Sequence, residues 1–291
     1  MDKEAMKQQI LESLTRKLGS GFHLSTHKAF KTNLKLDALI ILRDGKNFAP
    51  CIYLDSFYRE LEKGACVEDV TDSILQSYFH AMADVGGFDA TPISDFCYVE
   101  KRLYVELINR HSNTELLQGV PHSLFLDDFA VVARCLVNVD SDGQASFLVH
   151  HNHLMAWGID QETLLSIAMQ NTRKLFGVEI MGMEEILSGL MGGVPQSSPQ
   201  LPLWVMSNHK KMSGAATVLF DDVLKDFANT HGSFYVIFSS VHEVLLIPSG
   251  NVADIDGLTK INREVNKAEV RADEVLGTKA YFYDREKGFV Y

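Results

Sequence analysis

Short apolar runs that pair across turns, each followed by a helix, constrain the fold of this chain more than any other feature. Leu36–Leu42 and Phe48–Leu54 flank an Asp44-Gly45 turn, which predicts a β-hairpin with a helix after it. The same order recurs near residues 125–176 and 203–231. Because the segments differ in length, a solenoid is excluded. We therefore predict an α+β fold of repeated β-hairpin–helix units with antiparallel sheets, possibly in two domains.

Amphipathic spacing predicts several helices. Residues 4–18 carry an apolar stripe that ends at Gly19, and residues 67–83 repeat apolar side chains every four positions. Residues 163–176 form a third helix, for which Asp160 is the expected N-cap. Further helices are expected at 56–62, 113–118, 183–190, 221–231 and 254–276, and further strands at 145–150, 203–207, 215–220, 233–239, 244–248 and 280–283.

One segment has the composition of a linker. Residues 192–202 hold three Pro, two Gly and two Ser in eleven positions, which favours a loop over any regular element. We place a domain boundary there, between an N-terminal α+β region (1–191) and a C-terminal α+β domain (203–291). A long loop within a single domain is the alternative reading.

Composition excludes several classes of protein. The chain has 27 Lys and Arg against 38 Asp and Glu, a net charge of −11, so its field opposes nucleic-acid binding. No apolar run reaches the length of a membrane-spanning helix, and the first residues lack the apolar core of a signal peptide. The four cysteines are never spaced as CxxC, which favours the reducing cytoplasm. We expect no cofactor, and the oligomeric state stays open.

Three blocks of sequence resemble a bacterial family of unknown function that is common in gut-dwelling anaerobic Gram-positive species. They comprise residues 107–122, from Leu107-Ile108-Asn109-Arg110 to Val120-Pro121-His122; residues 145–172, with Trp157-Gly158 and Asn171-Thr172; and residues 205–243, from Val205-Met206-Ser207-Asn208 to Ser239-Ser240-Val241-His242-Glu243. The resemblance spans nearly the whole chain and implies no catalytic assignment. This chain has His150-His151 where the family more often has Thr-Asn.

The most conspicuous polar cluster is His150-His151-Asn152-His153. If these residues continue a strand, His151 and His153 share a face and become candidate metal ligands together with a distant carboxylate. The alternative is a solvated strand end at which Asn152 caps the next turn. We favour the second interpretation and predict no metal site.

A second cluster is Ser239-Ser240-Val241-His242-Glu243. In an extended chain Ser240 and His242 point the same way, so they are candidates for a nucleophile and its base. Leu246 occupies the position of the second ligand of an HExxH motif, which excludes the zinc-protease reading. One alternative is a turn whose serine side chains satisfy backbone groups. Another is a contact with a polar ligand or a partner, to which Ser239 and Glu243 would contribute.

The segment from Asn208 to Gly214 is a third candidate. Its Ser213-Gly214 end suits backbone N–H groups that bind an anion, although the spacing of a phosphate loop is missing. An exposed hairpin loop is the simpler reading. Of the cysteines, Cys51 and Cys135 lie in apolar strand patterns and are expected to be inert core residues.

The sequence thus leaves the function open among three hypotheses. The leading one is a non-enzymatic binding or regulatory protein that recognises a protein partner. The second is a small-molecule hydrolase or ligand-binding enzyme with Ser240, His242 and Asn208 in a cleft. The third is a phosphate- or nucleotide-binding module built on residues 208–214.

Overall fold

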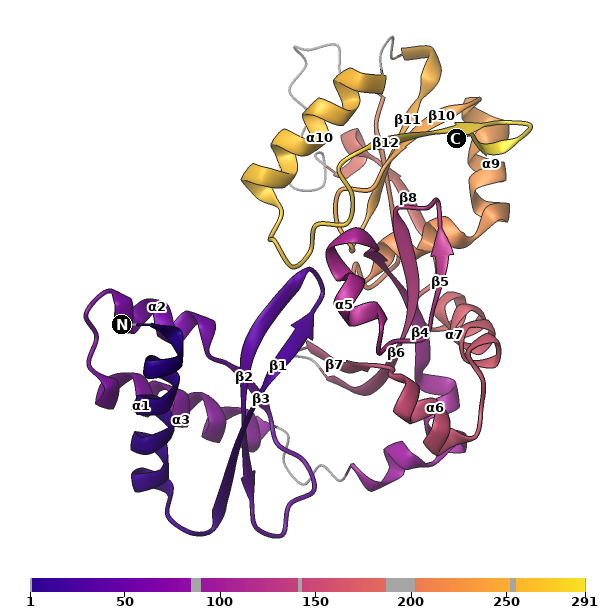
Figure 1. Ribbon diagram of the computed structural model, residues 1–291. Coiled ribbons are helices and arrows are strands. Elements are labelled where there is room, and N and C mark those ends of the chain that lie inside the picture. Colours follow the sequence, from indigo (N-terminus) through magenta and orange to yellow (C-terminus); the bar gives the residue numbers. More distant parts are fainter. Residues whose placement is uncertain (1, 85–89, 141–142, 187–201, 252–254, 291) are drawn as a thin grey trace. The chain divides into compact units, whose positions relative to one another are not determined.

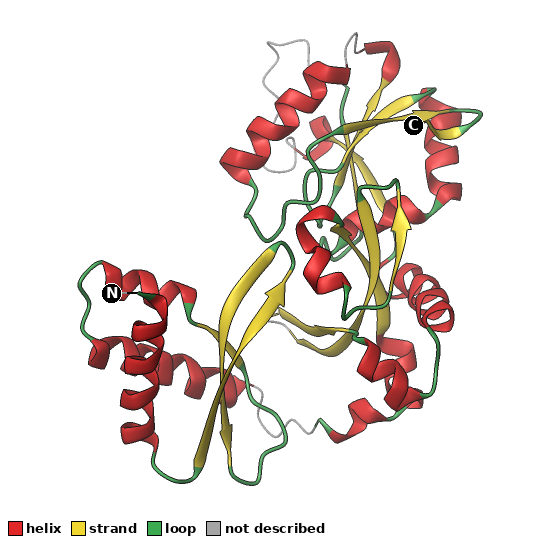
Figure 2. Cartoon of the chain, viewed as in Figure 1, coloured by secondary structure: helices red, strands yellow, loops and turns green. Residues whose placement is uncertain are grey.

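The computed structural model describes residues 2–84, 90–140, 143–186, 202–251 and 255–290 (Figure 1). It divides into two compact units, Met1–Asp95 (unit 1) and Phe96–Tyr291 (unit 2). Each unit contains helices and antiparallel strands, which confirms the predicted α+β class (Figure 2).

Three helices of unit 1 were predicted from the sequence and are confirmed. They are α1 (Lys3–Leu18), α2 (Asp55–Glu62) and α3 (Val67–Asp84). The Asp2 side chain caps α1 by accepting a 2.7 Å hydrogen bond from the Ala5 N–H, which satisfies one of the free donors of the first turn. Gly19 ends α1 with a φ of 72°, a conformation that favours glycine.

The sheet of unit 1 has the strand order β1-β2-β3. A long hairpin joins β1 (Phe22–Lys31) to β2 (Leu34–Arg43), and β3 (Cys51–Tyr53) pairs with the other edge of β2. Figure 2 shows the helices on one side of this sheet. The core between the layers consists of Met6, Ile10, Leu14, Leu39, Ile41, Ile52, Leu54, Tyr58, Val70, Ile74 and Tyr78.

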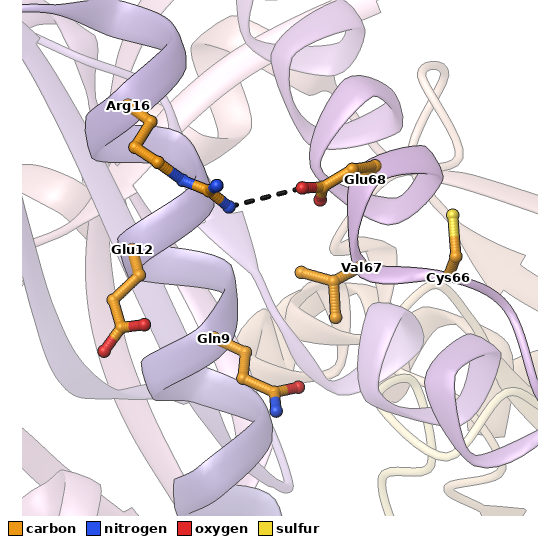
Figure 3. Close-up of a pocket in the computed structure, with 6 residues that line it drawn as sticks. All are labelled: Gln9, Glu12, Arg16, Cys66, Val67 and Glu68. Carbon is orange, nitrogen blue, oxygen red and sulfur yellow. Dashed lines mark hydrogen bonds and ion pairs between the residues drawn. The ribbon is translucent and has the colours of Figure 1, made fainter.

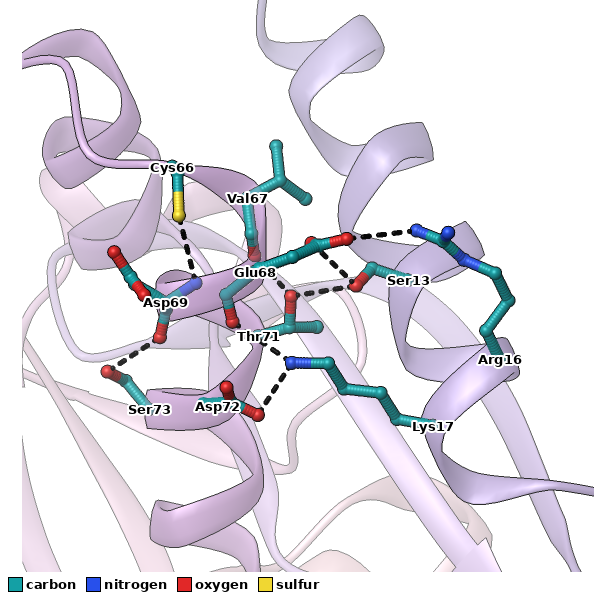
Figure 4. A network of polar contacts seen from close by, with 10 residues as sticks. All are labelled: Ser13, Arg16, Lys17, Cys66, Val67, Glu68, Asp69, Thr71, Asp72 and Ser73. Carbon is teal, nitrogen blue, oxygen red and sulfur yellow. Dashed lines mark hydrogen bonds and ion pairs between the residues drawn. The ribbon is translucent and has the colours of Figure 1, made fainter.

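Polar contacts join α1 to the first turns of α3 (Figure 4). The Thr71 hydroxyl donates to Ser13 Oγ at 3.0 Å, and Ser13 donates to Glu68 at 3.2 Å. Lys17 Nζ lies 2.6 Å from Asp72 Oδ1. Glu68 and Asp69 also place negative charge in the first turn of α3, at the positive end of its dipole, which stabilises the start of the helix.

Unit 2 contains a four-stranded sheet built around one long strand. The strand β6 (Phe129–Asp140) pairs with β4 (Leu103–Asn109) along one edge, and with β5 (His122–Phe125) and then β7 (Gly143–Leu148) along the other. The helix α7 (Gln161–Phe176) packs on β4 and β6. Its N-cap is Asp160, as predicted, which accepts from the Thr163 N–H at 2.8 Å. Short helices complete this region: η2 (Glu100–Arg102), α4 (Phe96–Val99), η3 (His111–Asn113), α5 (Thr114–Leu117) and α6 (His151–Trp157).

The second sheet of unit 2 has six strands in the order β13-β12-β10-β11-β9-β8. Its helices are η4 (Gly214–Leu219), α9 (Asp221–His231) and α10 (Ile255–Glu269), and η5 (Ser249–Asn251) follows β11. The strands are β8 (Glu179–Gly182), β9 (Trp204–Ser207), β10 (Phe234–Ile237), β11 (Val244–Pro248), β12 (Ala280–Asp284) and β13 (Gly288–Val290).

Aromatic side chains join the two sheets of unit 2. The ring of Phe129 on β6 lies 4.5 Å from that of Phe238, which follows β10, and 5.6 Å from that of Tyr281 on β12. Phe125 on β5 lies 5.6 Å from Phe289 on β13. These separations suit edge-to-face and tilted ring pairs, so the sheets share one aromatic core.

Two predicted elements differ from the structure. Residues 215–220 are not a strand, because they form most of the 3₁₀ helix η4, in which the Thr217 hydroxyl donates to the Gly214 carbonyl. The hairpin–helix unit near 203–231 is therefore wrong. The helix predicted over 254–276 ends at Glu269, and residues 274–276 bond instead to the segment after β10: the Val241 N–H donates to the Glu274 carbonyl, and the Leu276 N–H donates to the Ser239 carbonyl.

The predicted linker, 192–202, lies largely outside the described residues. Of the helix predicted at 183–190, residues 183–186 are helical and the other four lie outside the described residues. Strands from both sides of that segment belong to one sheet, since β8 pairs with β9 from Glu179–Ser207 to Gly182–Trp204. The compact units divide instead between Asp95 and Phe96. A separate domain over 203–291 stays a prediction.

Candidate functional site

The structure brings the loop after β9 against the turn between β10 and β11. Asn208 is buried in this loop, and its side chain closes the loop on itself. Asn208 Oδ1 accepts from the N–H groups of Lys210 at 3.0 Å and Met212 at 3.4 Å, while Nδ2 donates to the Met212 carbonyl at 2.8 Å. The N–H groups that an anion would need are therefore engaged within the loop.

Ser213 connects this loop to the four-stranded sheet. Its φ of 50° lies in the left-handed region, which is uncommon for a residue other than glycine. The Ser213 N–H donates to His242 Nδ1 at 3.3 Å, and its hydroxyl donates to Glu106 on β4 at 2.7 Å. The strained backbone thus directs two donors of one residue to two different elements.

Glu106 is a buried carboxylate with a cationic partner. Arg134 on β6 donates to Glu106 at 3.2 Å and to Ser146 Oγ on β7 at 3.1 Å. The attraction of Glu106 raises the pKa of Arg134 above its ordinary value, while burial opposes this effect. Tyr104 donates to the same Ser146 oxygen at 3.1 Å, and burial raises the pKa of Tyr104. Ser213, Glu106 and Arg134 therefore form one satisfied network.

Ser240 and His242 lie close together, but their side chains do not form a nucleophile–base pair. The Ser240 hydroxyl donates to Glu243 Oε1 at 2.7 Å and accepts from the His242 N–H at 3.0 Å. Because the hydroxyl proton is directed at Glu243, it is not directed at the imidazole. Ser239 donates to Asn266 Oδ1 on α10 at 2.7 Å.

The imidazole of His242 is oriented by the groups on either side of it. Because Nδ1 accepts from Ser213, the ring proton lies on Nε2, which is 3.6 Å from Glu274 Oε1. The His242 carbonyl accepts from Ser207 Oγ at 2.7 Å. The two segments predicted from the sequence, 208–214 and 239–243, therefore meet in one polar cluster, and the hydrogen bonds of Ser213 to Glu106 and His242 join the two sheets of unit 2.

Gly214 is where this cluster is most tightly packed. A Cβ atom there would lie 2.2 Å from Ser207 Oγ and 2.3 Å from the His242 carbonyl oxygen. We expect Gly214→Ala to lower the free energy of unfolding of unit 2 by at least about 2 kcal/mol, because backbone has to move. Urea unfolding followed by circular dichroism measures this loss. Gly250→Ala is the control, since a Cβ at Gly250 meets nothing within 4 Å; equal losses in both variants would contradict the prediction.

The histidine cluster begins a helix and does not continue a strand. The helix α6 starts at His151, and the N–H of the N-cap residue, His150, donates to His153 Nδ1 at 3.0 Å. The His153 ring stacks on Trp157 with a centroid separation of 5.5 Å. Among the residues that the structure describes, no three His, Cys, Asp or Glu side chains are grouped to hold a metal ion.

The α6 cap predicts a pH dependence. Burial lowers the pKa of His150, although a hydrogen bond to the Gly119 carbonyl partly offsets this shift. Burial also lowers the pKa of His153. Both rings then bind protons less readily in the folded than in the unfolded chain. Their contribution to stability is complete above the unfolded pKa, about 6.5, and falls as the pH drops through the lower folded values.

We expect His153→Gln to reduce the loss of stability between pH 7.5 and pH 5, because glutamine accepts the same N–H without titrating. The measurement is the urea midpoint of unit 2 at both pH values. His151→Gln is the matched control, since His151 is exposed in the first turn of the same helix. An identical pH profile for wild type and His153→Gln would overturn the prediction.

The cysteines differ in their surroundings. Cys135 is buried on β6 as predicted, and burial raises the pKa of its thiol to about 12. Cys51 is exposed on β3, so its prediction as a core residue is wrong. The short strand β3 buries Ile52 and leaves its two neighbours outward, as strand alternation requires.

A shallow groove of about 310 Å³ lies between α1 and the start of α3 (Figure 3). It is lined by Gln9, Glu12, Arg16, Cys66, Val67 and Glu68. Arg16 and Glu68 pair across it at 3.2 Å, and both side chains are more than half exposed. A ligand in this groove would meet an ion pair whose two side chains already satisfy each other and face solvent.

The sequence analysis missed the strand β1, which lies at the edge of the unit 1 sheet. Within the described part of the chain, β2 is the strand that pairs with β1. Most of the side chains of β1 are exposed, including Phe30 at 39%. Two features of the sequence could have indicated β1. Phe22 and Leu24 alternate as in a strand, and Asn33 is a residue that suits the positive φ of a hairpin turn, here 61°.

The fold defines a mixed α+β protein with antiparallel sheets, in which no described helix is long and apolar enough to span a membrane. A family model described as "Family of unknown function (DUF5688)" matches residues 3–285. The chain therefore belongs to this family, as the resemblance implied. Searches of the curated proteins and of the solved structures find no match.

Proposed function

We propose that this protein is a recognition module that binds an extended segment of a partner protein along β1. The observation that carries the proposal is the exposed edge of β1. Strand addition at a sheet edge uses main-chain hydrogen bonds for affinity and alternate side chains for specificity. A ten-residue strand offers enough backbone for a segment of ordinary strand length.

The backbone of β1 supports this mode of binding. Lys31 and Leu34 pair across a two-residue turn, and hydrogen-bonded and non-hydrogen-bonded pairs alternate from there along the hairpin. The N–H and C=O groups of Leu24, Thr26 and Lys28 then point away from β2. The register from Phe22–Arg43 to Lys31–Leu34 is unbroken, without a bulge that would turn the edge aside, and β1 contains no proline.

The polar cluster of unit 2 favours this proposal over the other two hypotheses. The Ser240 hydroxyl is directed at Glu243, which leaves the proposed hydrolase without an aligned nucleophile. In the loop proposed to bind phosphate, three N–H groups already have acceptors. Those of Lys210 and Met212 donate to Asn208 Oδ1, and that of Ser213 donates to His242 Nδ1. The Ser240 contact fixes the turn between β10 and β11, and the contacts of Asn208 and His242 fix the loop after β9.

The test is a proline at the outward-facing position. We expect Thr26→Pro to weaken peptide binding at least about tenfold, because it removes an N–H that the partner strand needs, while an edge position tolerates proline. The peptides are binders selected from a random displayed library against the whole chain. Thr26→Ala, which keeps the N–H, is the control, and thermal unfolding checks that both variants fold.

Amide hydrogen exchange locates the bound peptide independently. We expect slower exchange at Leu24, Thr26 and Lys28 in the complex. Failure to select any binder, or binders that protect other residues and tolerate Thr26→Pro, would overturn the proposal.

A further inference from the structure

We infer that the segment bound by β1 carries two apolar side chains, two residues apart, which pack against the flank of α1 that faces away from α3. This inference rests on the proposed function. It starts from the positions of the helices over the sheet of unit 1. The helix α1 contacts β1 at one edge of the sheet, and α3 contacts β3 at the other edge. The flank of α1 that faces away from α3 therefore lies on the side where a strand added to β1 would lie.

Helical spacing assigns two leucines to this flank. Ser13 and Arg16 of α1 contact Glu68 of α3, so their side chains mark the flank that faces α3. At about 100° per residue, Leu11 and Leu18 point in roughly the opposite direction. Both leucines pack against the core of unit 1, yet each is only half-buried. This flank of α1 therefore leaves apolar surface open to a neighbouring segment.

The helix-side face of β1 continues this apolar surface. Phe22 and Leu24 share that face with the core residue Ile41, which pairs with Leu24, and both are half-buried. Because a short connection joins α1 to β1 and the two pack together, they run in opposite directions. Leu18 therefore lies toward Phe22, and Leu11 lies about 10 Å further along, which corresponds to roughly three residues of strand. We call Leu11, Leu18, Phe22 and Leu24 the apolar strip.

A strand added beside β1 would bring alternate side chains to the apolar strip. The outward N–H and C=O groups of Leu24 and Thr26 would hold its main chain against the edge. Its helix-side side chains, two residues apart, would then lie beside the strip and bury apolar surface there. The side chains between them would lie beside His23 and Ser25, which are exposed on the other face. The strip therefore favours a segment that carries apolar residues at two alternate positions and polar residues between them.

The edge and the apolar strip together select an extended segment of another protein. An α-helix uses its own N–H and C=O groups internally, so it would leave the outward groups of β1 without partners. A second copy of β1 is a poorer fit. A full-length antiparallel pair of two β1 strands is centred on Thr26 and puts Lys28 of each copy beside Leu24 of the other. Lys28 is ion-paired with Asp37 at 2.6 Å, so a charged side chain would then lie beside the strip in place of an apolar one.

The experiment compares two synthetic peptides of about ten residues, the length of β1. Both contain two leucines among serine and threonine, separated by one residue in the first peptide and adjacent in the second. Adjacent leucines point to opposite faces of a sheet, so one of them misses the apolar strip. We expect the first peptide to bind the whole chain at least about fivefold more tightly, measured by fluorescence anisotropy. Because the two compositions are the same, the pattern alone accounts for the difference.

A pair of variants connects this preference to α1. Leu11→Ser removes an apolar side chain from the strip, and we expect it to abolish most of the preference for the first peptide while the second peptide still binds. Leu61→Ser is the matched control, since Leu61 is half-buried against the same core but lies on α2. It should leave the preference unchanged. Thermal unfolding checks that both variants fold.

Methyl NMR of the unmodified chain gives a readout that needs no variant. We expect nuclear Overhauser effects between the leucine methyl groups of the first peptide and those of Leu11 and Leu18. Contacts of the peptide with Leu36 or Leu42 instead, which lie on the opposite face of β2, would overturn the inference.

The outcomes distinguish the inference from the proposed function. Equal affinities for the two peptides, both weakened by Thr26→Pro, would overturn the inference and leave edge binding intact. So would failure of both peptides to bind while library-selected binders still protect Leu24, Thr26 and Lys28. Binding that Thr26→Pro does not weaken would overturn the proposed function itself. Concentration-dependent dimers in analytical ultracentrifugation that Thr26→Pro abolishes would identify a second copy as the occupant and reject a segment of another protein.

Discussion

Phe129→Ala is expected to lower the free energy of unfolding of unit 2 by about 3–5 kcal/mol. The Phe129 ring is fully buried and contacts Phe125, Phe238 and Tyr281, so its removal leaves a cavity between the two sheets. The neighbouring rings belong to strands of both sheets, which limits how far either can move to fill the space. Urea denaturation followed by tyrosine and tryptophan fluorescence measures the effect.

The control for this variant is Leu124→Ala. Leu124 lies on the neighbouring strand β5 and is 50% exposed, so the same kind of truncation removes little buried surface. We expect its loss to stay below about 1 kcal/mol. If Phe129→Ala destabilised unit 2 no more than Leu124→Ala, the aromatic contact between the sheets would contribute little to its stability.

Glu106→Ala is expected to cost about 3 kcal/mol, because it leaves the charge of the partly buried Arg134 without its carboxylate. It also removes the acceptor of the Ser213 hydroxyl. The left-handed backbone of Ser213 then loses one of the two contacts that hold it. Urea denaturation of unit 2 measures the total effect.

A double variant separates the two causes. Glu106→Ala combined with Arg134→Met removes both charges, and we expect it to be more stable than Glu106→Ala alone. Ser213→Ala, in contrast, removes the hydroxyl and keeps the ion pair, so its loss should be smaller. A double variant as unstable as Glu106→Ala would show that the uncompensated charge is not the main cause of the loss.

Local patterns predict the long helices of this chain well. The helices α1, α3 and α7 have continuous amphipathic stripes, and the ends of α1 and α7 carry capping side chains and glycines that act within a few residues. The hairpin of β2 and β3 follows in the same way from its turn. These elements are determined by interactions between near neighbours in the sequence.

The sequence predicts less where tertiary contacts decide the structure. The strand β1 was missed because its side chains are mostly polar and exposed, so hydrophobic alternation is weak there. Residues 215–220 were assigned to a strand because a short buried apolar run fits a strand or a helix equally well. The contact between Glu106 and Ser213 joins residues 107 positions apart, which no local pattern reveals.

The pairing of β8 with β9 gives the chain an opportunity for fragment complementation. These strands lie side by side in one sheet, yet the chain between Gly182 and Trp204 passes through the segment of linker composition. Two polypeptides that divide the protein within this segment would each carry one partner of the same ladder. If two other proteins were fused to the new ends of these fragments, pairing of β8 with β9 would report that the two fused proteins associate.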